Sequence, residues 1–234
     1  MKTLIVIPTY NEAQQIASTI QAVRGEQPAV SILVVDDNSP DGTHRIVSEI
    51  VAREPRVSLL HRDQKKGLGL AYLAGFEWGF EKGFELIVEM DADGSHLASD
   101  LGALLEASKN ADLVIGSRWI AGGQVQNWPA LRRFVSRFGN SYARFLLGTK
   151  IFDMTSGFRV YRASFLKQLV AKQVSSHGYS FQVELAFRAS ELGVVSERPI
   201  TFVERINGKS KMTLGIVLEA LTKVTFWGLK RIFS

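Results

Sequence analysis

The feature that most constrains the fold is a regular alternation of short apolar runs and helical patterns from the N-terminus to about residue 120. The runs are rich in β-branched residues, and the segments between them carry apolar residues three and four positions apart. Alternation of this kind is typical of parallel βαβ units, which form an open sheet covered by helices on both faces. The predicted strands are Thr3 to Ile7, Ser31 to Val35, Val57 to Leu60, Leu86 to Met90 and Asp112 to Ile115, and the predicted helices are Glu12 to Arg24, Asp41 to Arg53, Leu68 to Lys82 and Ser99 to Ser108.

The pattern changes after residue 120, where the regular alternation ends. From Leu214 the sequence predicts a final helix. We therefore expect an α/β fold with a single open, mixed but mostly parallel sheet flanked by helices over residues 1–212, followed by an amphipathic C-terminal helix over residues 213–234. The other elements predicted here are helices over Leu131 to Leu147, Ala163 to Val170 and Phe181 to Leu192, a loop over Asp153 to Arg159, and a strand over Glu197 to Val203.

Composition limits the cell compartment and the partners. The chain has 28 Lys and Arg against 23 Asp and Glu, a surplus that fits an anionic partner such as a phosphate, a nucleic acid or an acidic lipid. The absence of cysteine excludes disulfides and thiolate metal sites. The apolar run from Leu4 to Ile7 is too short for a secretion signal, and no stretch approaches the ~20 apolar residues that span a bilayer. We therefore expect a cytoplasmic protein whose membrane contact is peripheral.

Polar residues follow four of the predicted strands at the point where each strand ends. In open parallel sheets, ligands bind at the carboxyl ends of the strands, where the N-termini of helices also point. These positions are therefore the candidate binding site. They are Thr9 to Glu12, Asp36 to Ser39, Asp91 to Gly94, and Ser117 with Arg118.

The pair Asp91 and Asp93 is the strongest candidate for a metal site. Their i, i+2 spacing directly after a strand lets both carboxylates lean toward one point. A diphosphate can approach two carboxylates only with a divalent ion between them, and oxygen ligands favour Mg²⁺ or Mn²⁺. A solvated turn is the alternative for such a pair, but the strand-end position favours the metal.

Two other site types share this acidic pattern. An EF-hand loop needs a Glu twelve positions in from Asp91, where Gly102 stands, so calcium binding of that kind is excluded. A phosphatase of the haloacid dehalogenase kind also carries Asp-x-Asp-Gly after a strand, but there the motif normally opens the chain. The companion segments decide between the remaining interpretations.

Eight motif segments, the acidic pair among them, occur in order along the chain: Pro8 to Glu12, Val35 to Thr43, Gly67 to Gly69, Met90 to Asp93, Gly116 to Arg118, Asp153 to Arg159, Gly178 to Gln182 and Arg205 to Lys211. With them the chain resembles the family 2 glycosyltransferases, and among these the dolichol-phosphate and polyprenol-phosphate mannose synthases, over essentially its whole length. The dehalogenase interpretation does not account for these segments. The resemblance implies a fold of the GT-A type and transfer of mannose from GDP-mannose to a polyprenyl monophosphate, with inversion at the sugar and a divalent metal.

The resemblance also implies roles for individual residues. Asp91 and Asp93 would hold the metal, and Asp93 and Arg118 would act in catalysis. For Asp37 the alternative to nucleotide binding is an N-cap role, and for residues 132–137 the alternative to phosphate binding is a solvated helix face. The nucleotide site would comprise Pro8, Tyr10, Glu12, Val35, Asp37, Asp91, Ala92, Arg205 and Lys211, and the acceptor phosphate would meet Arg118, Arg132 and Ser136.

Asp153 and His96 are polar residues in or beside the motif segments that are not assigned to the predicted site. Asp153 is expected either to orient the sugar or to cap a helix N-terminus. His96 stands beside the acidic turn, but a single histidine there is weak evidence, so it is not included in the predicted site.

The C-terminal segment has helical spacing of apolar residues, with Lys223, Lys230 and Arg231 elsewhere on its surface. Such a helix could contact an anionic membrane surface on the cytoplasmic face. Packing against its own domain, an oligomer or a membrane-protein partner is the alternative. Phe226, Trp227 and Phe233 are the aromatic candidates for lipid contact.

Three other functions remain open at this point. The same fold could transfer glucose or an N-acetylhexosamine from a UDP-sugar, or serve as a catalytically silent nucleotide-sugar binding subunit. The intact Asp91, Asp93, Arg118 and Lys211 argue against the silent subunit, and a phosphatase is more distant still. We expect no nucleic acid partner.

Overall fold

The structure is a computed structural model that describes residues 1–174, 179–204 and 214–232. Seven strands form one central sheet and two short strands form a second. The strands are β1 (Thr3–Thr9), β2 (Ser31–Asp36), β3 (Val57–His61), β4 (Leu86–Glu89), β5 (Leu113–Ser117), β6 (Gln124–Gln126), β7 (Arg159–Arg162), β8 (Val195–Pro199) and β9 (Thr201–Val203).

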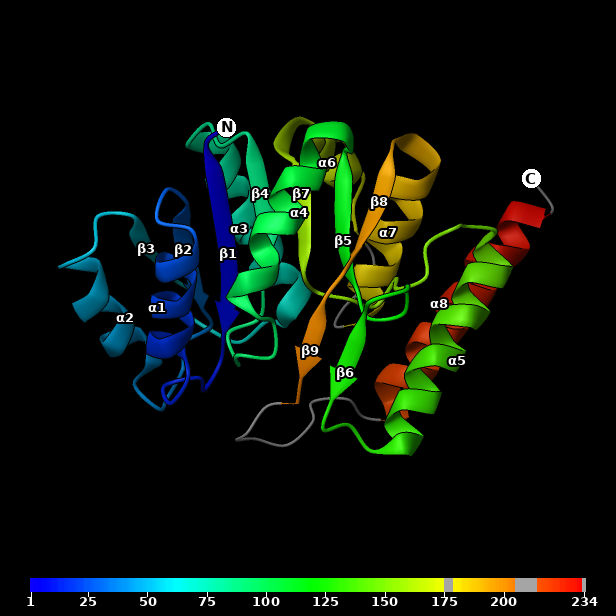
Figure 1. The fold of residues 1–234 in the computed structure, drawn as a ribbon, viewed down its shortest axis with the longest axis horizontal. Helices are drawn as coiled ribbons and strands as arrows, with labels where there is room; N and C mark the ends of the chain where they lie inside the picture. Colours follow the sequence, from blue (N-terminus) through cyan, green and yellow to red (C-terminus); the bar gives the residue numbers. More distant parts are fainter. Residues whose placement is uncertain (175–178, 205–213, 233–234) are drawn as a thin grey trace.

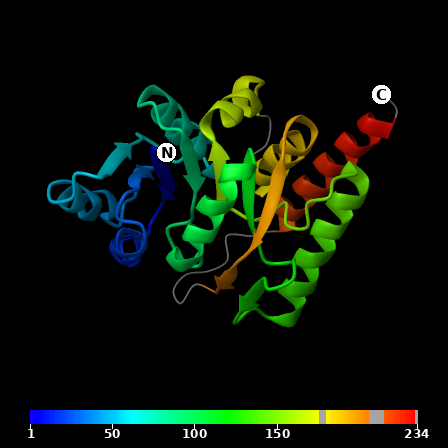
Figure 2. The same cartoon turned by 45° about the horizontal axis from the view of Figure 1, so that its top comes forward.

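The helices cover both faces of the central sheet, as Figures 1 and 2 show. Short 3-10 turns at Ala98–Asp100 and Ser108–Asn110 flank one of them. The helices are α1 (Ile16–Glu26), α2 (Thr43–Val51), α3 (Leu68–Glu81), α4 (Leu101–Ala107), α5 (Ala130–Leu147), α6 (Ala163–Ala171), α7 (Tyr179–Leu192) and α8 (Leu214–Ile232).

The central sheet has the strand order β3-β2-β1-β4-β7-β5-β8. Among its pairings, those of β7 with β4 and β5 are antiparallel and the others are parallel. The predicted mixed, mostly parallel sheet is confirmed. The short sheet pairs β6 with β9 in parallel and lies beyond the end of β5 and β8 (Figure 1).

The near-continuous apolar strands are explained by burial on both faces. On β1, Leu4 and Val6 pack into the core with α3, α6 and α7, whereas Ile5 and Ile7 pack into the core with α1 and α4. Successive side chains of a strand point to opposite faces, so a strand covered on both sides needs apolar residues at every position.

Glycines bring α3 very close to the sheet. A Cβ at Gly75 would lie 2.4 Å from Val6 Cγ1, and one at Gly79 would lie 3.0 Å from Leu4 Cδ2. The two glycines are four positions apart and therefore share one face of the helix. This close approach sets the position of the loop before α3 relative to the ends of the strands.

Most sequence-predicted elements are confirmed, with ends shifted by a few residues, but three predictions differ. The strand predicted over Glu197 to Val203 is two strands, because at Ile200 the chain changes partner from β5 to β6. Pro199 stands directly before the change and is the local sign in the sequence that the strand is not continuous. The antiparallel β7 and the short β6 were not predicted, and α1 begins at Ile16 instead of Glu12.

The C-terminal helix α8 packs beside α5 at the end of the sheet and also contacts α7 (Figure 1). Tyr142 Oη and Thr225 Oγ1 are 2.7 Å apart, and Val224 is buried. Gly228 allows close contact, since a Cβ there would lie 3.1 Å from Leu146. Within the described part of the chain, no helix is both long enough and apolar enough to span a membrane.

Candidate functional site

A cavity of about 320 Å³ lies at the carboxyl ends of the parallel strands, where the polar motifs meet. One part of its wall comes from the loops after β1, β2 and β4, and another from α5, α7 and α8. The predicted site residues in this wall are Pro8, Tyr10, Glu12, Asp37, Asp91, Ala92, Asp93, Arg118, Arg132 and Ser136.

The part of the cavity near β1 and β2 is held in shape by the basic residues that follow β3. Arg62 Nη1 lies 2.9 Å from Asp37 Oδ1, and Lys65 Nζ lies 3.9 Å from the centre of the Tyr10 ring. The N-cap alternative for Asp37 does not apply, because Asp41 accepts the hydrogen bond from the Thr43 backbone N–H at the start of α2, at 3.0 Å. Asp37 is thus available to the cavity wall.

Val35 differs from the prediction. Its side chain is fully buried in the core and is not part of the cavity wall. The reason is its position inside β2, where it faces α3: a Cβ at Gly75 would lie 3.3 Å from Val35 Cγ2. Its side chain therefore packs between β2 and α3 in the core beneath the cavity. Arg205 and Lys211 lie outside the described residues.

Both carboxylates of the acidic pair reach the cavity. Asp93 accepts hydrogen bonds from the backbone N–H and the hydroxyl of Ser95, in a turn that Gly94 enables with a φ of +75°. Gly157 faces the other carboxylate, and a Cβ there would lie 3.6 Å from Asp91 Oδ1. The turn and the facing glycine leave the two carboxylates exposed to a ligand in the cavity.

His96 orients the backbone of Asp91. Its Nδ1 accepts a hydrogen bond from the Asp91 N–H at 3.1 Å, so in the neutral ring Nε2 carries the proton and faces Asp91 Oδ2 at 3.9 Å. The ring is buried between Phe158 and Phe202, with centroids 5.0 and 5.4 Å away. Burial lowers the pKa of His96 to about 4, which keeps the ring neutral at pH 7.

The donor set fits a divalent ion that the substrate helps to bind. In the parts of the chain that the structure describes, no group of three or more His, Cys, Asp or Glu side chains is arranged to hold a metal. Asp91 and Asp93 offer carboxylate oxygens only. Mg²⁺ is commonly bound by one or two carboxylates together with substrate phosphates and water, so two carboxylates are sufficient for such a site.

Arg118 enters the cavity wall as half of a buried ion pair. Its Nε and Nη2 each lie 2.7 Å from an oxygen of Asp153, and its backbone N–H donates to the same carboxylate at 2.9 Å. Burial alone would raise the pKa of Asp153, but the Arg118 guanidinium and its hydrogen bonds lower it below the usual range. Asp153 is therefore a fixed anion.

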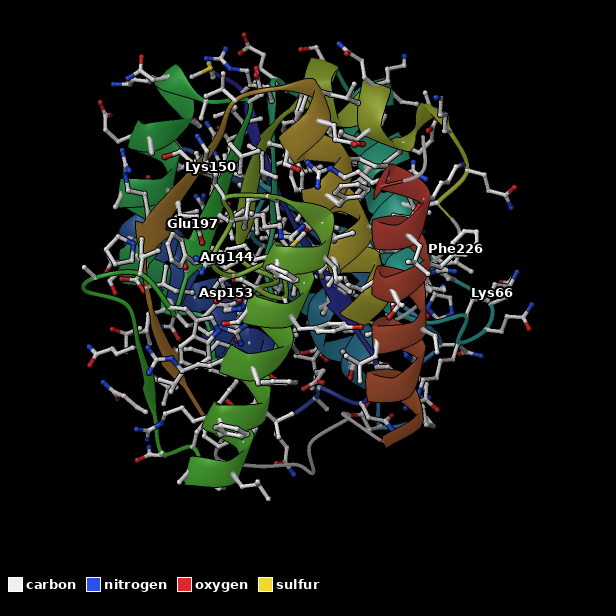
Figure 3. The ribbon with its side chains drawn as sticks, turned by 90° about the vertical axis from the view of Figure 1, so that its right-hand side faces the viewer. Lys66, Arg144, Lys150, Asp153, Glu197 and Phe226 are labelled. Carbon is white, nitrogen blue, oxygen red and sulfur yellow. The ribbon has the colours of Figure 1, made fainter. Side chains whose placement is uncertain are left out.

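Asp153 takes neither of the two roles predicted for it. It is fully buried, and its backbone N–H donates to Glu197 Oε1 at 3.0 Å. Figure 3 shows Asp153 and Glu197 near each other behind α5. Asp153 thus positions Arg118 and does not face the cavity or cap a helix.

On α5 the helix geometry separates the predicted acceptor residues from their neighbours. Arg132 and Ser136 lie four positions apart and both line the cavity, whereas Arg133 and Arg137 are exposed on another face. Arg132 forms an ion pair with Glu204 and lies over the Trp128 ring, 4.1 Å from its centre. The alternative of a solvated helix face therefore applies to Arg133, while Arg137 is exposed but lies over the Trp119 ring, 5.5 Å from its centre.

A fully buried arginine beneath the site was not predicted to have a role. Arg159 donates to the carbonyl oxygens of Met154 and Ser156 at 2.7 Å and of Gln182 at 2.9 Å, and its Nε lies 3.8 Å from Glu89. It fixes the loop that carries Gly157 opposite Asp91. The signal in the sequence was the Asp153 to Arg159 segment, but the residue type gave no sign that this arginine would be internal.

The remaining wall of the cavity is apolar and was also missed. Val135, Gly139 and Tyr142 contribute from α5, and Leu221 and Val224 contribute from α8. The spacing of α8 predicts an apolar face but not the surface that it covers. The cavity therefore has a polar end at the carboxylates and an apolar end between α5 and α8.

Comparison with known proteins identifies the family. Residues 4–170 match the family described as Glycosyl transferase family 2. The chain belongs to this family. The glycosyltransferase is 50% identical over 230 residues to undecaprenyl-phosphate mannosyltransferase of Micrococcus luteus, an alignment that covers 98% of this chain and 95% of the relative. It is 48% identical over 232 residues to polyprenol monophosphomannose synthase of Mycolicibacterium smegmatis, covering 98% and 88%.

Solved structures support the fold of the glycosyltransferase. Glucosyl-3-phosphoglycerate synthase from Mycobacterium tuberculosis, in complex with Mn²⁺, UDP and phosphoglyceric acid, superposes with a TM-score of 0.70 at 17% identity, over 97% of this chain and 78% of that one. A mannosyltransferase from Pyrobaculum calidifontis, in complex with GDP-Man and Mn²⁺, gives 0.60 at 19% identity, over 89% and 58%. The predicted GT-A type fold is confirmed.

Proposed function

We propose that this glycosyltransferase transfers mannose from GDP-mannose to a polyprenyl monophosphate and inverts the configuration at the anomeric carbon. The observation that carries the proposal is the cavity with two chemically different ends, because a lipid phosphate has the same two parts. The names of the two relatives at about half identity support mannose as the sugar and a polyprenyl phosphate as the acceptor. For such an acceptor we propose that the enzyme acts peripherally at the cytoplasmic face of a membrane.

The donor nucleotide would occupy the end of the cavity near β1 and β2. Glu12 and Asp37 can accept hydrogen bonds from ribose hydroxyls and ring N–H groups of the nucleotide. Tyr10 contributes an aromatic ring to the same wall, and Lys65 Nζ lies over this ring. Pro8 and Ala92 would complete this wall, with Arg205 and Lys211 proposed for the diphosphate.

Asp91 and Asp93 would hold a divalent ion, Mg²⁺ or Mn²⁺, on the diphosphate. When bound, such an ion neutralises charge on the diphosphate and so makes it a better leaving group. Asp93 faces the cavity from a turn in which Ser95 donates two hydrogen bonds to its carboxylate, which suits it to position the sugar beside the leaving group.

The acceptor phosphate needs no strong general base. Its second pKa near 6 leaves it mostly dianionic at neutral pH, so a phosphate oxygen is already a nucleophile. The protein must instead offset the repulsion between an anionic acceptor and an anionic donor. That task falls to the cationic side chains between the two ends of the cavity.

The two arginines would divide this work. The Arg132–Glu204 pair is about one-fifth exposed, with side-chain exposures of 20% and 23%, so an incoming phosphate can compete with Glu204. The Arg118–Asp153 pair is 7% and 0% exposed and is held by two hydrogen bonds of 2.7 Å. Arg132, with Ser136, would therefore bind the phosphate, while Arg118, held in place by Asp153, would line the cavity beside it.

The reaction then follows from this placement. An acceptor phosphate oxygen attacks the anomeric carbon from the side opposite the diphosphate, a new carbon–oxygen bond forms, and the bond to the diphosphate breaks. The electron pair of the broken bond leaves with GDP. A single displacement of this kind gives a product of inverted configuration.

The test is transfer of labelled mannose from GDP-mannose to a short-chain polyprenyl phosphate with Mg²⁺ or Mn²⁺, comparing wild type with Asp93→Ala. We expect a lipid-linked mannose that disappears with chelator and in the variant. Product from a UDP-sugar and none from GDP-mannose would contradict the proposed donor. No product from either donor would favour a silent nucleotide-sugar binding subunit.

A further inference from the structure

Helix α5 carries a glycine, Gly139, in the middle of its length. Glycine in a helix interior is less favourable than alanine, because it loses more backbone freedom on folding. Such a glycine usually has a reason, which is a backbone conformation with positive φ, close packing against a neighbour, or a function.

The first two reasons do not apply to Gly139. Its φ is not among the positive values, which occur for example at Gly67 and Gly148. Outside the backbone of its own helix, no atom of the described residues lies within 4 Å of a Cβ placed at Gly139. Gly75 of α3 is the opposite case, since a Cβ there would lie 2.4 Å from Val6 Cγ1. Gly139 thus faces open space, and a functional reason for it should be sought in that space.

The space beside Gly139 belongs to the apolar end of the cavity. Ser136, Gly139 and Ala143 follow each other at three and four positions on one face of α5, and all three line the cavity. Side chains at this spacing are about 5–6 Å apart. Gly139 therefore lies one step beyond Ser136, where a lipid phosphate bound at Ser136 would begin its hydrocarbon chain.

Helix α8 forms the opposite side of this part of the cavity. Helices α5 and α8 lie side by side and run in the same direction (Figures 1 and 2). They meet at Tyr142 and Thr225, whose hydroxyl oxygens are 2.7 Å apart. About one turn earlier in each helix, Gly139 and Leu221 both line the cavity. The missing side chain on α5 therefore widens the cavity just before the two helices come into contact.

A side chain added at position 139 would enter this space. The Cα–Cβ bonds of a helix tilt toward its N-terminus, so each residue covers the turn that precedes it. On α5 that turn carries Val135 and Ser136, which line the cavity. A larger residue at position 139 would therefore fill the passage from the phosphate to the first carbons of the chain, and would leave the nucleotide end unchanged.

A polyprenyl chain needs this room more than a straight chain does. Each isoprene unit carries a methyl branch, and the first branch lies close to the phosphate. A straight alkyl chain is narrower by one methyl group at that point. One such group in an apolar pocket changes selectivity by about tenfold or more.

We propose that Gly139 determines acceptor specificity, because its missing side chain leaves room for the branched first isoprene unit of the lipid phosphate. This proposal rests on the proposed function for the class of acceptor, and it names the residue that admits the branch. Arg132 and Ser136 hold the phosphate of a branched or a straight chain alike. Gly139 acts on the hydrocarbon alone.

The test compares the binding of radiolabelled farnesyl phosphate and dodecyl phosphate, which have main chains of equal length with and without methyl branches. Equilibrium dialysis in the presence of GDP and Mg²⁺ measures both affinities. We expect Gly139→Leu to bind farnesyl phosphate at least about thirtyfold more weakly than wild type, and dodecyl phosphate less than about threefold more weakly. Gly139→Ala should lie between. Equal losses for the two ligands, no loss for either, or no binding of either by wild type would overturn the proposal.

Thermal unfolding shows whether Gly139 serves packing instead. Gly139→Ala should raise the unfolding midpoint by about 2–4 °C, because alanine is the better helix former and meets no described atom. The matched control is Gly25→Ala in α1, where a Cβ also meets no described atom within 4 Å and the residue does not line the cavity. This control should gain similar stability and keep both affinities. A lower midpoint in Gly139→Ala would show a packing role and contradict the proposal.

Transfer assays separate this proposal from the proposed function. Wild type should transfer labelled mannose from GDP-mannose to farnesyl phosphate, and Gly139→Leu should have at least about thirtyfold lower kcat/KM for this acceptor. If wild type binds farnesyl phosphate without transferring mannose, while Gly139→Leu does not bind it, the proposed function fails and the role of Gly139 stands. If the two proteins bind farnesyl phosphate and transfer mannose equally well, the role of Gly139 fails and the proposed function stands.

Discussion

The buried pair of Arg118 and Asp153 makes a sharp prediction for the variant Asp153→Asn. The carboxylate accepts two hydrogen bonds of 2.7 Å from the guanidinium and one of 2.9 Å from the Arg118 backbone. Asparagine keeps the shape but has no charge and only one acceptor oxygen. The substitution therefore leaves the Arg118 cation buried without its counterion.

The size of the effect follows from the burial of both partners. Asp153 is fully buried and Arg118 is 7% exposed, so solvent screens the pair little. Removing one partner of a buried pair typically costs about 3–5 kcal/mol. We expect Asp153→Asn to lower the free energy of unfolding by about 3 kcal/mol at pH 7, since the retained amide oxygen keeps one hydrogen bond.

The effect should also depend on pH in a defined direction. The pKa of Asp153 is lower in the folded protein than in the unfolded chain, so at acid pH the unfolded chain binds the proton first. The pair's contribution is complete above the unfolded pKa of about 3.9 and is lost as the pH falls through the folded pKa. The difference between wild type and Asp153→Asn should be constant from about pH 8 to 5 and shrink below about pH 4.

The assay is urea unfolding over this pH range, with Arg118→Gln and the double variant completing a cycle. Strong coupling between the two substitutions is expected, because each removes the partner of the other. A loss below about 1 kcal/mol for Asp153→Asn, or effects that add to within about 0.5 kcal/mol in the cycle, would refute the reasoning.

Three further predictions follow from other contacts. Gly75→Ala should lower the free energy of unfolding by about 1–3 kcal/mol, because the new Cβ would lie 2.4 Å from Val6 Cγ1. Thermal or urea unfolding measures this loss, and an unchanged stability would mean that α3 can shift away from the sheet. Arg132→Ala should raise KM for the acceptor at least about tenfold. Arg133 does not line the cavity, so Arg133→Ala should leave this KM unchanged. Equal effects of the two substitutions on KM would contradict the role of Arg132 in phosphate binding. Arg159→Lys should cost about 3 kcal/mol in urea unfolding, because a lysine cannot reach the same three carbonyls, and a loss below about 1 kcal/mol would contradict this.

The sequence located the polar end of the site well, for a physical reason. The carboxyl ends of parallel strands meet at one edge of a sheet, so Tyr10, Asp37 and Asp91 had to come together once the alternation was recognised. Arg132 and Ser136 were predicted from the family resemblance, and the helical period of α5 explains why both line the cavity while Arg133 and Arg137 do not. In each case a regular backbone period fixes where a side chain points.

What the sequence did not reveal depends on contacts between distant segments. Arg118 and Asp153 are 35 positions apart, and nothing local indicates that each would satisfy the other. Val35 could not be separated from the wall-forming residues of its motif, because a motif match does not say which side of a strand faces the cavity. The amphipathic pattern of α8 predicted an apolar face, but the spacing of its apolar residues could not show that this face packs against α5.

The direction of β7 has a consequence for where this chain tolerates changes of length. Because β7 runs against β4, Arg159 pairs with Glu89 at the carboxyl end of β4, and Arg162 pairs with Leu86 at the far end. Residues before β7 therefore meet the cavity, whereas those after it begin α6 at the opposite edge. An insertion just before Arg159 would therefore disturb the catalytic edge. The junction of β7 and α6 is remote from the chemistry but does not tolerate an insertion either, because α6 begins directly after β7 and the buried Ala163 donates its N–H to the Glu85 carbonyl at 2.9 Å.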